Sequence, residues 1–471
     1  MPRWLFVLKG CSKSIVINGE HCRSFNTSIH NCACLILIVY PSFIDGNQQL
    51  IAFSEPIMPG ISSCSPALVS AGLDFRHETA FWDQGFDCLP SDDGKSYIMV
   101  LGGLGYIGSH TVLELLQEGF NVIAVDDLSN SFKTVLARIT TLAQTHCRLT
   151  GLIMPALRFH KMDYRSHAIN DLLARYSASR SRISAVIHFA AFKSVSESIA
   201  QPLAYYRNNV CGLVDLLATL QQHGIKNFVF SSSATVYGAK ANSGEPLHEE
   251  DLVHIDEVQT DEDGNKILRL NGANGLSSPY GRSKYFSEAI LADLARADPS
   301  MRITALRYFN PVGCHPSGIL REDPRQTPTN LFPVVTSVMQ GKKDTLEVFG
   351  TDWNTRDGTA IRDFIHVVDL ARGHVAALTA AASDVKREPF RAYNLGTGKG
   401  MTVAEVLTSF EEASQQQVPA VRAPRRAGDV GSCVAIVDRA ERELKWRAVK
   451  SVGDCARDCW NALKLPDVVE C

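Results

Sequence analysis

The fold is decided by residues 97–108, which read Tyr-Ile-Met-Val-Leu-Gly-Gly-Leu-Gly-Tyr-Ile-Gly. The first five residues form a short apolar run typical of a buried strand, and a glycine-rich turn follows at once. Apolar residues then recur at helical spacing as far as Gly119, and a second apolar run, 122–125, ends in Asp126. This order of strand, glycine turn, helix and strand predicts a βαβ unit that binds a dinucleotide, because the glycines let the backbone approach a pyrophosphate at the helix N-terminus.

Asp126 indicates which dinucleotide this unit prefers. It lies 18 residues beyond Gly108, at the end of the second predicted strand. A carboxylate at that place accepts hydrogen bonds from a ribose diol and repels a 2′-phosphate, so the sequence predicts NAD rather than NADP. A glycine-rich turn that binds no ligand is the simpler alternative, against which the acid in register argues.

The same alternation continues along the chain. Apolar runs at 185–190, 227–230 and 303–309 indicate buried strands, and residues 202–222 have strong helical periodicity. Strands alternating with helices predict an α/β fold with a doubly wound, Rossmann-type parallel sheet. Ligands of such sheets gather at the carboxyl ends of strands, where three segments are expected to lie: 189–193, 231–238 and 309–311. The serines in the second of these segments fit turns or helix caps equally well.

Residues 277–284, Ser-Ser-Pro-Tyr-Gly-Arg-Ser-Lys, place Tyr280 and Lys284 four residues apart on a predicted helix. Pro279 suits the first turn of that helix, and residues i and i+4 share one face, so both side chains can reach one pocket. A free phenol has a pKa of about 10, so a tyrosine base near neutral pH needs a decrease of about 3 units, to which a nearby cation contributes. The pair predicts a catalytic tyrosine, although an ordinary surface helix gives the same spacing by chance.

The composition describes a soluble globular protein long enough for two or three domains. Of the 471 residues, 45% are hydrophobic and 21% are charged, and the net charge is −3. This balance gives no general case for binding nucleic acid or an anionic membrane. The 13 cysteines are odd in number and lack the spacing of metal ligands, so neither a disulfide framework nor a metal site is expected. A reducing, cytoplasmic setting is the simplest expectation.

The first 95 residues differ from the rest, because they show no sustained periodicity. Their apolar run at 33–40 is cut by Pro41 and is shorter than the about 20 residues that span a bilayer. It also begins too far from Met1 for a standard signal peptide. We expect a poorly ordered extension or a misassigned start of translation, while a targeting or partner-binding role stays open.

From residue 97 onward the chain resembles a known family. As far as about Trp460 it is similar to the UDP-glucose 4-epimerases, which are extended short-chain dehydrogenases/reductases. The likeness rests on eight segments: Gly-Tyr-Ile-Gly-Ser-His-Thr (105–111), Asp-Asp-Leu-Ser-Asn-Ser (126–131), Ser-Ser-Ser-Ala-Thr-Val-Tyr-Gly (231–238), Ser-Pro-Tyr-Gly-Arg-Ser-Lys (278–284), Leu-Arg-Tyr-Phe-Asn-Pro-Val-Gly (306–313), Gly-Thr-Ala-Ile-Arg-Asp-Phe-Ile-His-Val (358–367), Tyr-Asn-Leu-Gly-Thr-Gly (393–398) and Ala-Pro-Arg-Arg-Ala-Gly-Asp (423–429). The resemblance implies reversible, NAD-dependent 4-epimerisation of UDP-glucose and UDP-galactose, a step of galactose metabolism.

The resemblance also assigns roles to residues at matching positions. Tyr280 is implied as the base, Lys284 as the group that holds the nicotinamide ribose and lowers the tyrosine pKa, and Ser233 as the partner of the reacting oxygen. The residues implied to contact NAD are Gly102, Gly105, Tyr106, Ile107, Gly108, Asp126, Asp127, Leu128, Ser129, Asn130, Ser131, Asp163, Tyr164, Phe189, Ala190, Ala191, Phe192, Lys193, Asn208, Tyr280, Lys284 and Phe309. Those implied to contact the UDP-sugar are Ser233, Asn310, Asn330, Leu331, Leu346, Glu347, Val348, Phe349, Arg362, Arg426, Asp429 and Cys433. The arginines suit bidentate phosphate recognition, although each alone would fit a solvated surface ion pair.

The expected organisation has three parts: an N-terminal extension (1–95), an NAD-binding Rossmann-type domain (96–307) and a smaller mixed α/β domain for the UDP-sugar (308–471). Later segments, such as 360–375 and 391–398, are expected to return to the larger domain. Members of the family are usually dimers through helices such as 203–222 and 279–297, so a homodimer is expected.

Three features depart from the family pattern. Leu101 replaces the usual small hydroxyl residue, which is expected to loosen one turn hydrogen bond and leave the pyrophosphate site intact. A longer, mostly polar segment, 246–278, contains a hairpin-like turn and is expected to be a surface excursion rather than an active-site lid. Cys433 stands where the family has tyrosine in enzymes restricted to glucose and galactose, and smaller residues in enzymes that accept N-acetylated sugars. It predicts activity on UDP-N-acetylglucosamine and UDP-N-acetylgalactosamine as well.

Three other functions share parts of this pattern. A nucleotide-sugar 4,6-dehydratase needs an added acid–base pair, normally Asp-Glu, where this chain has Ala234-Thr235. A bifunctional epimerase–mutarotase is not expected, because the chain ends soon after the epimerase-like region. A non-catalytic protein that senses nucleotides is the alternative of a different class, against which the intact Ser233, Tyr280 and Lys284 argue.

Overall fold

The computed structural model describes residues 93–260, 264–323, 325, 330–383, 388–426 and 429–465, together with three short strands nearer the N-terminus. The chain separates into two units, Met1–Phe75 and Arg76–Cys471. In the first unit, β1 (Leu5–Lys9) pairs antiparallel with β2 (Val16–Asn18) and with β3 (Leu35–Ile36). The expectation that residues 1–95 are poorly ordered otherwise falls outside the described residues.

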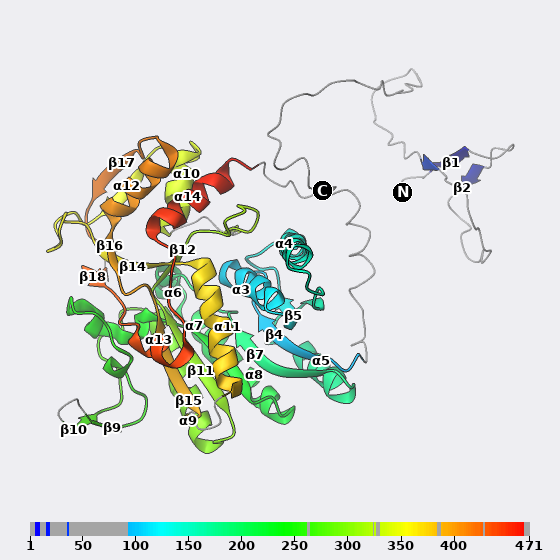
Figure 1. The fold of residues 1–471 in the computed structure, drawn as a ribbon, viewed down its shortest axis with the longest axis horizontal. Helices are drawn as coiled ribbons and strands as arrows, with labels where there is room; N and C mark the ends of the chain where they lie inside the picture. The colour runs from blue at the N-terminus through cyan, green and yellow to red at the C-terminus, as the bar shows by residue number, and fades with distance from the viewer. Residues whose placement is uncertain are drawn as a thin grey trace. The chain divides into compact units, whose positions relative to one another are not determined.

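A seven-stranded parallel sheet is the centre of the second unit (Figure 1). Its strand order is β15-β11-β8-β7-β4-β5-β6, and every neighbouring pair is parallel. The chain moves outward from β4 to β6 on one side and then from β7 to β15 on the other, so the order reverses between β4 and β7. The strands are β4 (Ser96–Leu101), β5 (Asn121–Asp126), β6 (Leu157–Lys161), β7 (Arg182–His188), β8 (Asn227–Ser233), β11 (Arg302–Tyr308) and β15 (Phe390–Leu395). The predicted doubly wound α/β fold is confirmed.

Helices cover both faces of this sheet. Alternate strand residues point to opposite sides, and because both sets are apolar, each face needs a covering layer. Ile98 and Val100 of β4 belong to one buried cluster, to which α3 (Tyr106–Gln117), α4 (Thr134–Thr150) and α11 (Val367–Ser383) contribute. Tyr97, Met99 and Leu101 belong to the other, with α5 (Ala168–Ala178), α8 (Gly212–Gln222) and α9 (Pro279–Ala297). A strand buried on both faces needs an unbroken apolar sequence, which is what residues 97–101 supply.

The helical run predicted over 202–222 is interrupted in the structure. It consists of α7 (Pro202–Tyr206), a π-helical turn (Arg207–Cys211) and α8, and the short α6 (Val195–Ala200) precedes it. The π turn contains Asn208 and Asn209, which are both buried. Such turns insert an extra residue into the helical repeat and are frequent at functional sites.

The long segment 246–278 contains the hairpin that its turn residues predict. β9 (Glu257–Thr260) pairs antiparallel with β10 (Lys266–Arg269), and Val258 and Leu268 on these strands are exposed. The beginning of the segment is different, because the 3-10 turn Glu249–Asp251 and the residues after it lie against the core. A longer 3-10 stretch, Ala234–Asn242, joins β8 to this segment.

The smaller part of the unit follows β11. β12 (Asn310–Val312) and β18 (Ser432–Cys433) each pair in parallel with β14 (Ile361–His366), and β16 (Gly400–Thr402) pairs antiparallel with it. β13 (Leu346–Phe349) and β17 (Ala420–Ala423) form a separate parallel pair. A third buried cluster joins these strands to α10 (Leu331–Met339), α12 (Val403–Ser414) and α14 (Val452–Leu463).

The chain crosses between the two parts of this unit more than once. β15 lies at the edge of the large sheet although it follows β14, and α13 (Asp438–Leu444) packs against it. α11, between these strands, packs against α3. In the described part of the chain, no helix is long and apolar enough to cross a membrane.

Candidate active site

Two positions at the junction of β4 and α3 leave room for glycine alone. Gly102 has a φ of +76°, and a Cβ there would lie 2.8 Å from the main-chain nitrogen of Ala190. A Cβ on Gly108 would lie 2.1 Å from the carbonyl oxygen of Gly102, because the helix begins in direct contact with the turn. Gly105 is the N-cap of α3 and presents no side chain to it, so the first N–H groups of the helix stay open to an anion.

Asp126 organises this turn and also the loop that follows β5. Its Oδ2 accepts a hydrogen bond from the main chain of Leu104 (3.0 Å), and its Oδ1 accepts from the main chain of Leu128 (2.9 Å) and from the Ser131 hydroxyl (2.8 Å). Leu128 has a φ of +62°, a left-handed conformation that costs a non-glycine residue about 1–2 kcal/mol. Since Oδ2 has one such donor, it keeps capacity for a ribose hydroxyl.

The other residues implied to contact NAD gather at the carboxyl ends of neighbouring strands. The main-chain N–H groups of Phe189 and Ala190 donate to the Leu101 carbonyl (2.8 and 3.1 Å), so the end of β7 borders the glycine turn. The Tyr164 hydroxyl donates to the Asn208 carbonyl (2.6 Å), which joins the end of β6 to the π turn. The rest lie on the same edge of the sheet or in the first turn of α3: Tyr106, Ile107, Asp127, Ser129, Asn130, Asp163, Ala191, Phe192, Lys193 and Phe309.

Tyr280 and Lys284 lie on α9, as their spacing predicts, and meet the end of β8. Ser278 caps the helix N-terminus with its side chain. The Lys284 ammonium is buried and donates to the Ser231 carbonyl at 2.6 Å. A hydrogen bond joins Tyr280 to Ser233, the last residue of β8, and favours the ionised phenol by lowering its pKa. The three residues proposed for catalysis are therefore brought together.

Burial dominates the electrostatics of this group. It raises the pKa of Tyr280 above its ordinary value, against the hydrogen bond from Ser233. Burial also lowers the pKa of Lys284 to about 7, while Glu288, one helical turn further on, acts to raise it. The sequence predicts a lowered tyrosine pKa, so the chain by itself gives the opposite direction. The physical reason is that the phenolate would lose its water, while the Lys284 ammonium is engaged by the Ser231 carbonyl.

A second cluster collects the charged residues implied to hold UDP. Arg362 on β14 is paired in register with Cys433 on β18, and burial lowers the pKa of its guanidinium. The Arg426 guanidinium lies 4.7 Å from the centre of the Phe349 ring and forms an ion pair with Asp429 (2.9 Å). The charges of Arg426 and Asp429 both act on the pKa of Arg362, so these residues form one electrostatic cluster. Two guanidinium groups in one cluster suit a diphosphate.

The remaining residues implied to contact the UDP-sugar have different surroundings. Asn310 Nδ2 donates to the Asp363 carbonyl (3.3 Å). Asn330 is the N-cap of α10, but its side chain makes no capping hydrogen bond, and Leu331 follows it. On β13, the side chains of Leu346 and Val348 are buried, that of Glu347 is exposed and that of Phe349 is partly buried. Within the described ranges, no cluster of His, Cys, Asp or Glu could hold a metal ion.

The sequence and the fold match known proteins. The family model described as "NAD dependent epimerase/dehydratase family" matches residues 98–396. The chain belongs to this family. UDP-glucose 4-epimerase 2 of Oryza sativa subsp. japonica is 44% identical over 370 residues, which cover 78% of this chain and 82% of that protein. The UDP-glucose 4-epimerase of Dictyostelium discoideum is 43% identical over 371 residues, 79% of this chain and 96% of that protein. The resemblance seen in the sequence is confirmed.

A solved member of this epimerase family has the same architecture. The crystal structure of UDP-glucose 4-epimerase from Bifidobacterium longum in complex with NAD+ and UDP is 40% identical in sequence, with a TM-score of 0.65. The match covers 78% of this chain and 97% of that one. NAD is the cofactor of the family, and this chain fits it. Side chains are excluded at Gly102 and Gly108, the open N-terminus of α3 faces the turn, and Asp126 disfavours a 2′-phosphate.

The family resemblance does not point to a buried polar network around Glu288 on α9. Glu288 accepts hydrogen bonds from Arg307 Nη2 (2.7 Å), from His254 Nε2 (2.8 Å) and from the Ser232 hydroxyl. These three residues come from β11, from the segment before the hairpin and from β8, so Glu288 holds α9 against each of them. Two sequence signals could have predicted the pair of Arg307 and Glu288. Arg307 lies inside an apolar strand, and Glu288 follows Lys284 by four residues.

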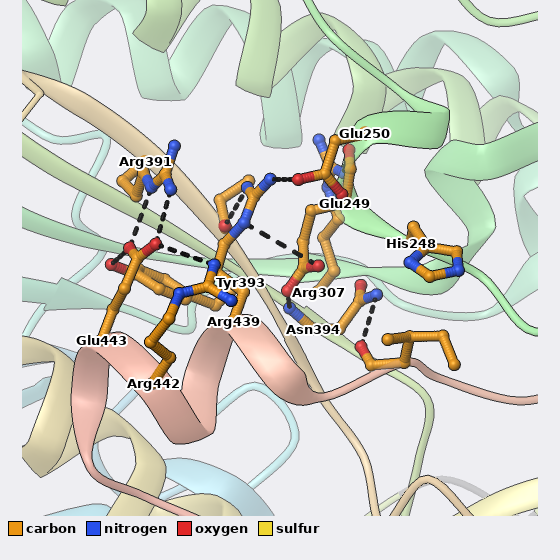
Figure 2. A network of polar contacts seen from close by, with 12 residues as sticks. His248, Glu249, Glu250, Arg307, Arg391, Tyr393, Asn394, Arg439, Arg442 and Glu443 are labelled. Carbon is orange, nitrogen blue, oxygen red and sulfur yellow. Dashed lines mark hydrogen bonds and ion pairs between the residues drawn. The ribbon is translucent and has the colours of Figure 1, made fainter. Parts of the chain in front are cut away.

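Arg307 extends this network toward the edge of the sheet (Figure 2). It donates to the Glu249 carbonyl (3.0 Å), and Glu249 Oε1 accepts from the main chain of Asn394 on β15 (2.8 Å). Figure 2 shows Arg439 beside Glu249 and Glu250, and its guanidinium donates to the Glu250 carboxylate. The start of the segment 246–278 is thus fixed to the sheet, although its hairpin is exposed.

Asn209 is a buried residue near the candidate site that the sequence did not single out. Its side-chain amide accepts from the main-chain N–H of Phe192 (2.9 Å) and donates to the Phe192 carbonyl (3.0 Å) and to Ser283 Oγ (3.0 Å). One buried amide therefore ties the loop after β7, the π turn and α9 together. Two consecutive asparagines within a helical run are the signal that could have identified it.

Proposed function

We propose that the protein interconverts UDP-glucose and UDP-galactose by reversible, NAD-dependent epimerisation at C4 of the sugar. The observation that carries this proposal is the hydrogen-bonded pair of Tyr280 and Ser233 at the carboxyl end of the sheet, with Lys284 beside it. Relatives named UDP-glucose 4-epimerase, 43–44% identical over more than three quarters of the chain, support it.

The chain supplies the proton chemistry of this reaction. Tyr280 removes the proton of the 4-hydroxyl, and Ser233 hydrogen-bonds the same oxygen as its charge develops. Lys284 holds the nicotinamide ribose. Bound NAD supplies the acceptor for the hydride of C4 and a positive ring that lowers the pKa of Tyr280, which burial alone raises.

The sugar must then present its other face. We infer that the 4-keto sugar stays attached through its UDP group, held by Arg362, Arg426 and Asp429, while it rotates. Tyr280 returns the proton to the oxygen when the sugar is reduced from the opposite side, so the enzyme ends each cycle unchanged. The guanidinium cluster can retain the diphosphate through this rotation, because charge-assisted hydrogen bonds to phosphate are about twice as strong as neutral ones.

The activity test is the formation of UDP-glucose from UDP-galactose by the purified, NAD-loaded protein. Tyr280→Phe removes the base and is expected to slow turnover about 10²–10⁴-fold. Tyr285→Phe is the matched control, because it makes the same change on the same helix at a residue whose ring packs against His254. A wild-type protein that binds UDP-galactose without converting it would identify a nucleotide sensor, and full activity of Tyr280→Phe would exclude this tyrosine as the base.

We further propose that the sugar range includes UDP-N-acetylglucosamine and UDP-N-acetylgalactosamine. Cys433 supports this proposal, because it is partly buried beside Arg362 and is much smaller than the tyrosine of the restricted enzymes. The same purified protein is assayed with UDP-N-acetylglucosamine. Turnover of UDP-galactose without any turnover of the N-acetylated sugar would reject the broader range.

We also propose that the protein is a homodimer. The surface of α6 to α9 exposes Ile199 (60%), Leu203 (80%), Val214 (44%) and Phe286 (43%), and α6 and α7 both pack against α9. Exposed apolar side chains on neighbouring helices suit an interface, and the family usually pairs through these helices. Light scattering is expected to give twice the chain mass for the wild type and a monomer for Leu203→Glu. A monomeric wild type would reject the proposal.

A cytoplasmic location is part of the proposal. The six described cysteines, Cys147, Cys211, Cys314, Cys433, Cys455 and Cys459, are all free thiols, which suits a reducing compartment. Fractionation of the cells that make the protein is expected to recover it with cytoplasmic enzymes, and recovery in a membrane or organelle fraction would contradict this location.

A further inference from the structure

Arg325 clamps the loop after β5, which is the loop implied to hold the adenosine half of NAD. Its main-chain N–H donates to Asn130 Oδ1 (3.1 Å), and its Nε donates to the carbonyls of Leu128 (3.2 Å) and Ser131 (2.9 Å). Its guanidinium also lies 4.1 Å from the centre of the Phe132 ring. The side chain of Arg325 thus contacts Leu128, Ser131 and Phe132, and its main chain contacts Asn130 between them.

The loop is strained where Arg325 holds it. Leu128 has a left-handed backbone (φ +62°), its N–H donates to Asp126 Oδ1 (2.9 Å), and its carbonyl accepts from Arg325. A strained conformation persists only when its surroundings fix it more than once. Asp126 and Arg325 hold the two ends of the same residue, so removing either lets the leucine relax toward an ordinary backbone conformation.

The residues just before Arg325 are fixed to the large part of the unit as well. Glu322 forms an ion pair with Lys193 in the loop after β7 (3.2 Å), and Asp323 forms one with Arg138 on α4 (3.1 Å). Lys193 is itself implied to contact NAD. The described residues 321–323 and 325 therefore connect the loops after β5 and β7, the two loops on either side of the glycine turn. The Lys193–Glu322 pair is exposed on its lysine side, and such pairs contribute about 0–1 kcal/mol, whereas the Arg138 partner of Asp323 is buried.

We propose that Arg325 is a cofactor-retaining residue, which keeps the loop 126–131 in its NAD-binding conformation and so keeps NAD bound through turnover. It is a positioning residue, because it acts through Leu128 and Ser131 and makes no contact with Tyr280, Lys284 or Ser233 that the structure describes. In this proposal, NAD leaves its site when this loop relaxes. The proposal depends on the NAD site and not on the sugar that the enzyme converts.

The test measures NAD retention without any sugar. Wild type, Arg325→Ala, Arg325→Lys and Arg457→Ala are loaded with NAD and dialysed together, and the NAD left per chain is released by acid and quantified. Arg325→Ala is expected to lose NAD at least tenfold faster, and Arg325→Lys to lose it at an intermediate rate, since an ammonium keeps the charge without the planar guanidinium. Arg457→Ala is the control, because Arg457 is an exposed arginine of α14 paired with Asp454, and it is expected to match the wild type.

A second readout separates retention from folding. At saturating added NAD, Arg325→Ala is expected to regain the thermal midpoint and the NAD occupancy of the wild type, because NAD still binds the variant but leaves it more readily. Retention equal to that of the wild type would overturn the proposal. So would an occupancy that stays low at saturating NAD, or an equal loss of NAD from Arg457→Ala.

Discussion

Gly108→Ala is expected to abolish tight NAD binding by a local steric effect. The new Cβ would lie 2.1 Å from the carbonyl oxygen of Gly102 and 3.0 Å from its carbonyl carbon. Close carbon–oxygen contacts in proteins are about 3.3 Å or longer, so α3 and the turn must separate by about 1 Å. Both partners are backbone, which cannot move aside as a side chain does. A shift of about 1 Å at the N-terminus of α3 misplaces the groups that meet the pyrophosphate. A misplacement of this size lowers the rate of turnover about 10²-fold.

Gly119→Ala, at the other end of the same helix, is the matched control. Gly119 has a φ of +87° and open space around a new Cβ, so the substitution costs about 1–2 kcal/mol of backbone strain without touching the turn. NAD per chain after gel filtration and the thermal midpoint with and without NAD are compared for both variants. Wild-type NAD content in Gly108→Ala would refute the reasoning, and equal loss in both variants would assign the effect to a weakened helix.

Three further changes have expected outcomes. Glu288→Gln leaves Arg307 as a buried, unpaired charge, so about 3–5 kcal/mol of stability should be lost, and an unchanged urea midpoint would contradict this. Cys433→Tyr should remove turnover of UDP-N-acetylglucosamine and keep that of UDP-galactose, whereas an equal effect on both sugars would argue against a role in sugar size. Burial lowers the pKa of His188 to about 3 and of His374 to about 4, so below about pH 6.5 the unfolded chain binds more protons than the folded one. Stability should therefore fall by about 1.4 kcal/mol per pH unit for each histidine between about pH 6.5 and pH 4, and a constant urea midpoint over that range would contradict this assignment.

The elements that the sequence predicts well are those with local signals. A strand that is buried on both faces needs apolar side chains at every position. The unbroken apolar run 97–101 can therefore be recognised without knowing which strands lie beside it. The spacing of Tyr280 and Lys284 also survives in the structure, because Pro279 and the cap at Ser278 fix the start of their helix. Local periodicity of this kind predicts the alternation of strands and helices that is typical of a doubly wound sheet.

The features that escaped prediction depend on residues far apart in the chain. Arg325 meets Leu128 across 197 positions, and neither residue carries a local sign of the other. The π turn at Asn208 and Asn209 breaks a periodicity that otherwise continues. The direction of the Tyr280 pKa could not be predicted either, since it depends on how much water the folded chain removes from the phenol.

In the proposed reaction, the hydrogen of C4 leaves the sugar and returns to C4 on the other face. UDP-galactose with deuterium at C4 is incubated in ordinary water with the purified protein and no added NAD, and the UDP-glucose formed is analysed by NMR. The product is expected to keep its deuterium at C4, because Tyr280 exchanges only the proton of the 4-hydroxyl with the solvent. UDP-glucose with hydrogen from water at C4, or no UDP-glucose from NAD-loaded protein, would contradict the account.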